Sequence, residues 1–217
     1  MPEFLSSPFI FLHIGGLISF TALALKDQLK LRSVLLVSII FAMIFHMLGE
    51  RGPEWQELLW NAVEFSINGI VLTQLVLDRT HIGLRGESEE LFNALKFLSP
   101  GEFRALLKLA KWETAEEMQV ITTEGVPPSD LFYVLKGHVH IEKGGRDPFV
   151  IEPRTFIGEV AFLHSTPASA TVRLEPGARF LRWPVDKLER GLQSKENLRI
   201  AVMRLISLDT ATKVARA

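Results

Sequence analysis

The chain has 217 residues, a formal net charge of −1 and no cysteine. The near-neutral charge gives no basic face for a nucleic acid, and the lack of cysteine excludes a disulfide framework, a thiolate zinc site and a cysteine nucleophile. With 47% hydrophobic and 23% charged residues, the sequence is too apolar for a soluble two-domain protein and too charged for a purely membranous one. It therefore predicts two unlike parts.

Three apolar segments near the N-terminus predict a membrane domain. They run from Phe4 to Leu25, from Leu31 to Leu48 and from Leu58 to Leu77. Each is close to the roughly 20 residues that a helix needs to cross a hydrocarbon core about 30 Å thick. A lysine and an aspartate directly follow the first segment and no basic residue precedes it, so we interpret it as a retained anchor and not as a signal peptide. We expect residues 1–80 to form a three-helix transmembrane domain in contact with membrane lipid.

The loops between these segments predict their orientation, because Lys and Arg near the ends of a span favour the cytoplasmic side. The first loop carries Lys26, Lys30 and Arg32, whereas the second loop, residues 49–57, is net acidic. Arginines also follow the third segment. We therefore expect an integral membrane protein with its N-terminus outside and its C-terminal domain, residues 81–217, in the cytoplasm.

Polar side chains interrupt the apolar segments. Asn61, Glu64 and Asn68 share one face of the third segment, because residues three and four apart lie above one another on a helix. His13 and His46 lie in the other two segments. We interpret these groups as hydrogen-bonding contacts between helices or between protomers, with an ion or proton path as the alternative. The polar stripe and an apolar C-terminal helix together predict a homo-oligomer.

After residue 80 the pattern becomes that of a soluble α+β domain. A helix is expected from Ser88, and a second one opens with the capping-box sequence Ser99-Pro-Gly-Glu102 and runs through Lys111. Short apolar segments separated by turn sequences then predict an antiparallel roll. Its strands are expected at Met118–Thr122, Leu131–Leu135, His138–Glu142, Phe149–Glu152, Ala170–Leu174 and Arg179–Trp183, and two closing helices at Val185–Leu192 and from Asn197 to about Val214.

The most specific motif is the stretch Phe156-Ile-Gly-Glu-Val-Ala-Phe-Leu-His-Ser-Thr-Pro-Ala-Ser-Ala-Thr-Val172. It resembles the phosphate-binding cassette of cyclic-nucleotide-binding domains, in which Phe-Gly-Glu-x-Ala-x-Leu is followed by a short turn and by Pro-Arg-x-Ala-Thr-Val. Ala168 stands where that family has its arginine. The resemblance covers about Leu91 to Leu208, and implies an antiparallel β-roll with flanking helices. With three apolar segments in front, the arrangement is similar to the Popeye-domain membrane proteins and their bacterial relatives.

The resemblance implies a ligand site in the cassette. In the family, a one-turn helix that begins at the position of Gly158 directs its N–H groups at the cyclic phosphate. Glu159 would then accept a hydrogen bond from the ribose 2′-hydroxyl or, alternatively, hold the turn by accepting backbone N–H groups. Ser169 would bind a phosphate oxygen. The implied site consists of Gly158, Glu159, Val160, Ala161, Ala168, Ser169, Ala170 and Thr171, with cyclic AMP as the expected ligand and no cofactor.

The missing arginine weakens the expected binding. Hydrogen bonds to a charged group contribute about 1.5 to 3 kcal/mol each, so the loss of a bidentate guanidinium lowers affinity by more than ~100-fold. Arg154 and Arg173 are candidate substitutes, with an ordinary solvated surface arginine as the favoured alternative for each. His138 and His140 share one face of a strand, but no third ligand has a suitable spacing, so no metal site is predicted.

Two functions remain open from the sequence. The chain is either a membrane-anchored regulatory protein that binds a cyclic nucleotide or a ligand-free assembly scaffold that retains the same fold. Gly158, Glu159 and Ser169 favour the first function, and Ala168 favours the second. The sequence carries no catalytic Ser/His/Asp spacing, P-loop or metal motif and no helix-turn-helix after the roll, so we expect neither an enzyme nor a transcription factor.

Overall fold

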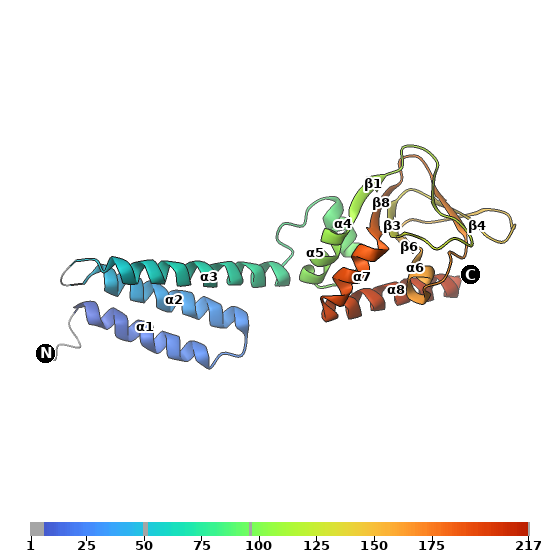
Figure 1. Cartoon of the computed structure of the whole chain (residues 1–217). Helices are drawn as coiled ribbons and strands as arrows, with labels where there is room; N and C mark the ends of the chain where they lie inside the picture. Colours follow the sequence, from blue (N-terminus) through green and yellow to red (C-terminus); the bar gives the residue numbers. More distant parts are fainter. Residues whose placement is uncertain (1–6, 50–51, 96, 217) are drawn as a thin grey trace. The chain divides into compact units, whose positions relative to one another are not determined.

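The computed structural model describes residues 7–49, 52–95 and 97–216. The chain divides into two compact units, Met1–Ile82 and Gly83–Ala217 (Figure 1). The predicted boundary lay between residues 80 and 81.

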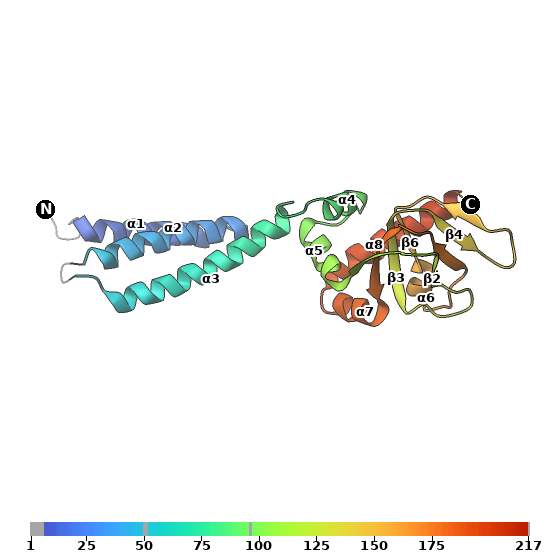
Figure 2. The same cartoon turned by 90° about the horizontal axis from the view of Figure 1, so that it is seen from above.

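The first unit consists of three helices, α1 (Ser7–Leu23), α2 (Gln28–Met47) and α3 (Trp55–Arg79). Helix α2 contacts both α1 and α3 (Figures 1 and 2). The carboxylate of Asp27 accepts hydrogen bonds from two backbone N–H groups in the first turn of α2 and so caps this helix. The three predicted segments correspond to these helices, and residues 4–6 of the first segment lie outside the described residues.

Close contacts join α1 to α2. The hydroxyl of Ser38 donates to the carbonyl oxygen of Gly15 at 2.8 Å. A Cβ atom at Gly15 would lie 3.1 Å from the Cβ of Phe41 and 3.2 Å from the carbonyl oxygen of Ser38. The glycine thus lets the two helix backbones approach closely.

The polar stripe of α3 does not act as one unit. Asn68 is buried, and its side-chain oxygen accepts a hydrogen bond from Arg32 of α2 at 2.6 Å. Asn61 instead donates to a carbonyl oxygen of its own helix, and Glu64 is exposed. The interhelical role predicted for the stripe is therefore confirmed for Asn68 alone.

Within the described residues, one helix is long and apolar enough to cross a membrane by length and composition, namely α2. Helix α1 is apolar but has 17 residues. Helix α3 has 25 residues, but Glu57, Glu64 and Asp78 lie along it. The structure thus provides one candidate span where the sequence predicted three, because acidic and amide side chains dilute the apolar character of α3.

The second unit contains five helices among the described residues: α4 (Glu87–Ala94), α5 (Pro100–Leu109), α6 (Glu159–His164), α7 (Val185–Gln193) and α8 (Glu196–Arg216). The predicted capping box of α5 is confirmed, since Ser99 and Glu102 each bond the other's backbone N–H group. The prediction that this helix reaches Lys111 is wrong, because the helix ends at Leu109 and Lys111 begins a strand.

Eight strands form two antiparallel sheets in the described part of this unit, with the orders β1-β8-β3-β6 and β2-β7-β4-β5. The six predicted strands are all present. Two short strands, β1 and β6, were not predicted, because neither is a clear apolar run flanked by turn residues. The strands are β1 (Lys111–Thr114), β2 (Gln119–Thr122), β3 (Asp130–Lys136), β4 (Val139–Glu142), β5 (Phe149–Ile151), β6 (Thr155–Ile157), β7 (Thr171–Leu174) and β8 (Arg179–Pro184).

Two apolar cores hold the roll together. One is built from both sheets and contains Phe132, Val172 and Phe180. The other packs β3, β6 and β8 against α4, α5, α7 and α8, and includes Tyr133 and Trp183. The indole N–H of Trp183 donates to the carbonyl oxygen of Leu106 at 3.0 Å. Side chains therefore fill the interior of the roll.

The turn between β3 and β4 requires a glycine. Gly137 has φ of +92°, a conformation that side chains with a Cβ rarely adopt. A Cβ atom there would lie 2.7 Å from both the Cα and the Cβ of Ala178. The two chain segments meet so closely that only a hydrogen fits between them.

Candidate ligand-binding site

The cassette, residues 156–172, begins within β6. Gly158 adopts a left-handed conformation with φ of 84° and starts the short helix α6. The N–H of Phe162 donates to the carbonyl oxygen of Gly158 at 2.9 Å, which is the first bond of this helix. The N–H groups of Glu159, Val160 and Ala161 therefore have no acceptor within the helix. This backbone geometry is the one that the resemblance implied.

Two backbone hydrogen bonds at Ala168 hold the segment of the cassette that leads into β7. The N–H of Ala168 donates to the carbonyl oxygen of Val126 at 3.0 Å, and its own carbonyl oxygen accepts from the N–H of Gly125 at 2.9 Å. Ala168 is only 7% exposed. The residue that replaces the family's arginine thus holds the cassette against the loop at Gly125 and Val126, and its N–H is already used.

The other predicted residues of this segment follow Ala168 directly. The hydroxyl of Thr171 accepts a hydrogen bond from the backbone N–H of Glu124 at 3.0 Å, and the carbonyl oxygen of Ala170 accepts one from the hydroxyl of Thr122 at 3.2 Å. Ser169 is exposed. Among these residues, Ser169 presents its side chain to solvent, whereas Thr171 helps to hold the loop that follows β2.

Glu159 has a partner that the sequence did not predict. It is 7% exposed, and its Oε1 lies 2.6 Å from the Nζ of Lys213 in α8. The partners expected from the sequence were a ribose hydroxyl or backbone N–H groups, and the structure pairs this carboxylate with an ammonium group instead. Lys213 also lies 2.9 Å from Asp209 of the same helix. No motif identifies Lys213, since it lies 54 residues away along the chain.

Helix α8 also bonds to the backbone of β6, which is an edge strand of its sheet. The N–H of Phe156 donates to the carboxylate of Asp209 at 3.3 Å, and the carbonyl oxygen of Phe156 accepts from Lys213. Both backbone groups of an edge position are thereby satisfied by side chains. Figures 1 and 2 both place α8 alongside α6 in the second unit.

The two arginines considered as substitutes are paired elsewhere. Arg154 begins the approach to β6 with φ of 67°, and its guanidinium lies 3.1 Å from the carboxylate of Glu90 in α4. Arg173 lies 3.1 Å from the carboxylate of Glu142 on the neighbouring strand. Both are ion pairs on the surface, in agreement with the alternative of ordinary surface arginines.

The two histidines of the β4 region face a carboxylate. The Nδ1 of His138 lies 2.9 Å from Glu175, and the Nε2 of His140 lies 4.0 Å from the same side chain. The backbone N–H of His138 donates to Glu175 and lowers the pKa of this carboxyl below its usual value. Across the described residues, no group of three acidic or histidine side chains has a geometry that holds a metal ion.

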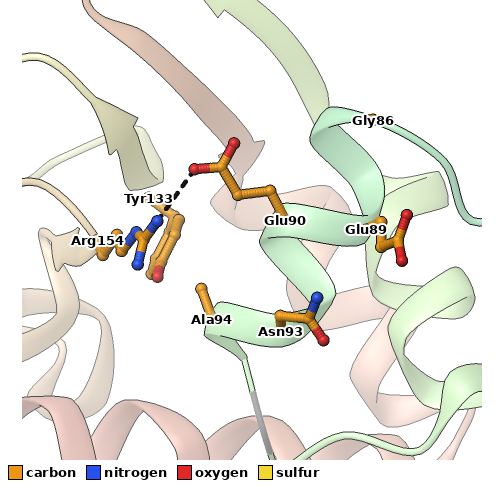
Figure 3. A pocket seen from close by; sticks show the side chains of 7 residues that line it. All are labelled: Gly86, Glu89, Glu90, Asn93, Ala94, Tyr133 and Arg154. Carbon is orange, nitrogen blue, oxygen red and sulfur yellow. Dashed lines mark hydrogen bonds and ion pairs between the residues drawn. The ribbon is translucent and has the colours of Figure 1, made fainter.

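A separate opening of about 690 Å³ lies between α4 and the outer face of β3 (Figure 3). Its polar lining includes Glu90, Asn93 and Arg154, and the ring of Tyr133 forms part of its wall. Burial raises the pKa of Tyr133, and the nearby charge of Asp209 adds to this effect. None of the predicted cassette residues lines this opening.

Comparison with known families identifies the second unit. Residues 112–195 match the family model described as cyclic nucleotide-binding domain. The chain carries a cyclic nucleotide-binding domain. This confirms the family that the cassette indicated.

Solved structures share the fold of this cyclic nucleotide-binding domain. A cyclic nucleotide-binding domain from Methylobacillus flagellatus is 22% identical over 59% of this chain and 78% of its own, with a TM-score of 0.52. A protein from Geobacter metallireducens described as cyclic nucleotide-binding is 12% identical over 59% of this chain and 96% of its own, with a TM-score of 0.51. At these identities the likeness shows the fold alone. A search of the curated proteins finds no match to this chain.

Proposed function

We propose that this protein is a membrane-anchored regulatory protein whose cytoplasmic cyclic nucleotide-binding domain binds cyclic AMP and carries out no catalysis. The observation that carries this proposal is the backbone of the cassette, in which Gly158 turns the chain into α6 and places Glu159 in its first turn. Such a turn presents backbone N–H groups to an anion. Ser169, exposed in the bend before β7, supplies a hydroxyl donor.

The proposed membrane anchor rests on the first unit. Helix α2 has the length and composition of a span, and we propose that α1 and α3 cross the bilayer with it. Asp27, in the loop before α2, lies 2.9 Å from Arg79 at the end of α3. Lys26 is adjacent to Asp27. Basic side chains therefore gather at the end of the unit from which the chain continues, which favours a cytoplasmic domain and an outside N-terminus.

A ligand-free scaffold is the second candidate function, and two observations favour it. Ala168 supplies no cation for a phosphate, and the carboxylate of Glu159 is already paired with Lys213. A domain of this kind would act through surfaces of the roll or of α3, in line with the homo-oligomer that the polar stripe predicts. The two candidates differ in whether the native chain binds a cyclic nucleotide at all.

The first test is a calorimetric titration of the purified full chain with cyclic AMP, cyclic GMP and 2′-deoxy cyclic AMP. We expect cyclic AMP to bind most tightly. We expect Glu159→Ala to weaken cyclic AMP about 10-fold or more relative to 2′-deoxy cyclic AMP, because a hydrogen bond to a charged group contributes about 1.5 to 3 kcal/mol. The 2′-deoxy ligand is the reference because it lacks the hydroxyl from which Glu159 accepts a hydrogen bond.

Glu152→Ala serves as the control for this titration, since Glu152 is an exposed carboxylate shortly before the cassette. It should bind all three nucleotides like the parent chain. An unchanged ratio between the affinities for cyclic AMP and 2′-deoxy cyclic AMP in Glu159→Ala would remove the ribose assignment. A parent chain that binds none of the nucleotides would favour the scaffold.

The orientation can be tested by labelling with a membrane-impermeant maleimide, since the native chain has no cysteine. Gly52→Cys, in the loop between α2 and α3, should be labelled in intact cells. Glu152→Cys, in the cyclic nucleotide-binding domain, should be labelled only after lysis. Labelling of Glu152→Cys in intact cells would contradict the proposed topology, and recovery of the chain in the soluble fraction would contradict the anchor.

A further inference from the structure

The end of α8 closes over the cassette through a single ammonium group. An ammonium has three N–H donors, and Lys213 has three acceptors around its Nζ: the carboxylates of Glu159 and Asp209 and the carbonyl oxygen of Phe156. All of its donors are thus used by its own chain. Lys213 is therefore held in place and is not a mobile surface lysine.

These contacts are shielded from water. The Glu159 side chain is 9% exposed, that of Asp209 is 19% exposed and that of Lys213 is 30% exposed. Charge-assisted hydrogen bonds are stronger at such sites than between exposed groups. The contacts also connect three elements, since Glu159 belongs to α6, Phe156 to β6 and the other two residues to α8.

The charges at this point oppose the arrival of a further anion, such as the phosphate of a nucleotide. Two carboxylates surround one ammonium, so the cluster is formally anionic beside the start of α6. In the family that the cassette resembles, an arginine offsets the ligand phosphate, whereas this chain has Ala168 there. Ligand binding therefore requires a rearrangement of these charges.

We propose that Lys213 is a built-in competitor for the nucleotide at Glu159, so that the cassette accepts a ligand only when the last turns of α8 detach. This inference rests on the proposed function, because it assigns regulation to the same site. A ribose hydroxyl that reaches the buried carboxylate of Glu159 competes with the ammonium for it. Once Lys213 is displaced, the carbonyl oxygen of Phe156 loses its ammonium donor, and the bond from the N–H of Phe156 to Asp209 is left to hold the end of α8 to β6.

The coupling is reciprocal. If the nucleotide favours the detached helix, then detachment of the helix must favour the nucleotide by the same factor. Anything that binds the end of α8 in its detached state would raise the affinity of the cassette. Helix α8 is thus the element that reports occupancy of the cassette to the rest of the protein.

The opposite role is a distinct outcome of the test. Lys213 could supply the cation that Ala168 lacks, by turning from Glu159 to the phosphate. A competitor and a replacement cation predict opposite effects when the charge is removed. Lys213→Gln keeps a polar side chain of similar length and removes the charge, so its affinity for cyclic AMP decides between the two roles.

The affinity experiment compares the full chain with Lys213→Gln, Lys213→Arg and Arg199→Gln. We expect Lys213→Gln to bind cyclic AMP about 10-fold more tightly, which corresponds to the loss of one charged hydrogen bond from the closed state. Lys213→Arg should bind like the parent chain. Arg199 is the matched control, because it is an exposed cation of the same helix that pairs with Glu196 at 3.8 Å. Arg199→Gln should also bind like the parent chain.

Hydrogen exchange tests the closed state without any nucleotide. The N–H of Phe156 and the backbone of residues 207–213 should exchange about 5-fold faster or more in Lys213→Gln than in the parent, because their bonds open more often. Arg199→Gln should leave these rates unchanged. Cyclic AMP added to the parent should accelerate exchange in the same segment.

The outcomes separate this inference from the proposed function. Weaker binding of cyclic AMP by Lys213→Gln would overturn the competitor and assign Lys213 to the phosphate. Unchanged exchange in Lys213→Gln would overturn the closed state itself. Faster exchange in Lys213→Gln without nucleotide binding by any variant would overturn both the proposed function and the competition, and would leave the contact between α8 and the cassette as a purely structural one.

Discussion

Replacing Ala168 with arginine is expected to raise the affinity of the full chain for cyclic AMP by about 100-fold, because a guanidinium adds two hydrogen bonds to the phosphate. Both backbone groups of Ala168 are bonded to the loop at Gly125 and Val126, so the new side chain starts from a fixed position. Ser169 follows it directly and is exposed. Calorimetric titration of the variant beside the parent measures the gain.

Ala168→Gln is the matched control for this substitution, since it introduces a long polar side chain without the charge. It should gain far less affinity than the arginine variant. A parent chain that binds nothing, together with an arginine variant that binds cyclic AMP, would favour the scaffold as the native function. If neither the parent nor the arginine variant binds, the cassette does not recognise a cyclic nucleotide.

The largest expected effect on stability comes from Gly137→Ala. We expect this substitution to destabilise the cyclic nucleotide-binding domain by about 3 kcal/mol or more, since it combines backbone strain at positive φ with overpacking. The clash cannot be relieved by rotating a side chain, because the nearest atom at 2.7 Å is the Cα of Ala178. Hydrogen exchange of the buried β3 amides measures the free energy of unfolding of this domain within the full chain.

Gly177→Ala isolates the contribution of the clash. Gly177 has φ of +85°, but a Cβ atom there would meet nothing within 4 Å. Its substitution should cost about 1 kcal/mol, from backbone strain alone. Equal costs at the two positions would show that the turn shifts to accommodate the methyl group and would contradict the tight contact described for Gly137.

Most of the second unit could be predicted from its sequence because its signals are local. The capping box of α5 and the turn glycines each act within a few residues, and alternating apolar segments mark the longer strands. Strand β6 escaped prediction because its last two residues open the cassette, where the family motif hides the strand pattern. The overlong prediction for α5 has a similar cause, since Ala110 and Lys111 continue a helical composition and only the pairing of β1 with β8 makes Lys111 a strand residue.

The candidate site was predictable in its backbone and not in its side-chain partners. A motif specifies the turn at Gly158, because a left-handed residue followed by a helix is a local property. The partner of Glu159 is a tertiary contact with a helix much later in the chain, and a single lysine carries no pattern. A hydrogen bond between helices, such as the one from Arg32 to Asn68, was predicted for the same local reason, since a polar residue in an apolar helix must find a partner.

The bonds from Asp209 and Lys213 to Phe156 have a consequence for assembly. These two side chains, one turn apart, cover the outward N–H and C=O of a strand at the margin of its sheet. An uncovered margin is a template onto which an extended segment of another chain can add. When the end of α8 detaches, the domain exposes such a template. The same movement of α8 accompanies occupancy of the cassette and frees the edge strand to pair with a neighbouring polypeptide.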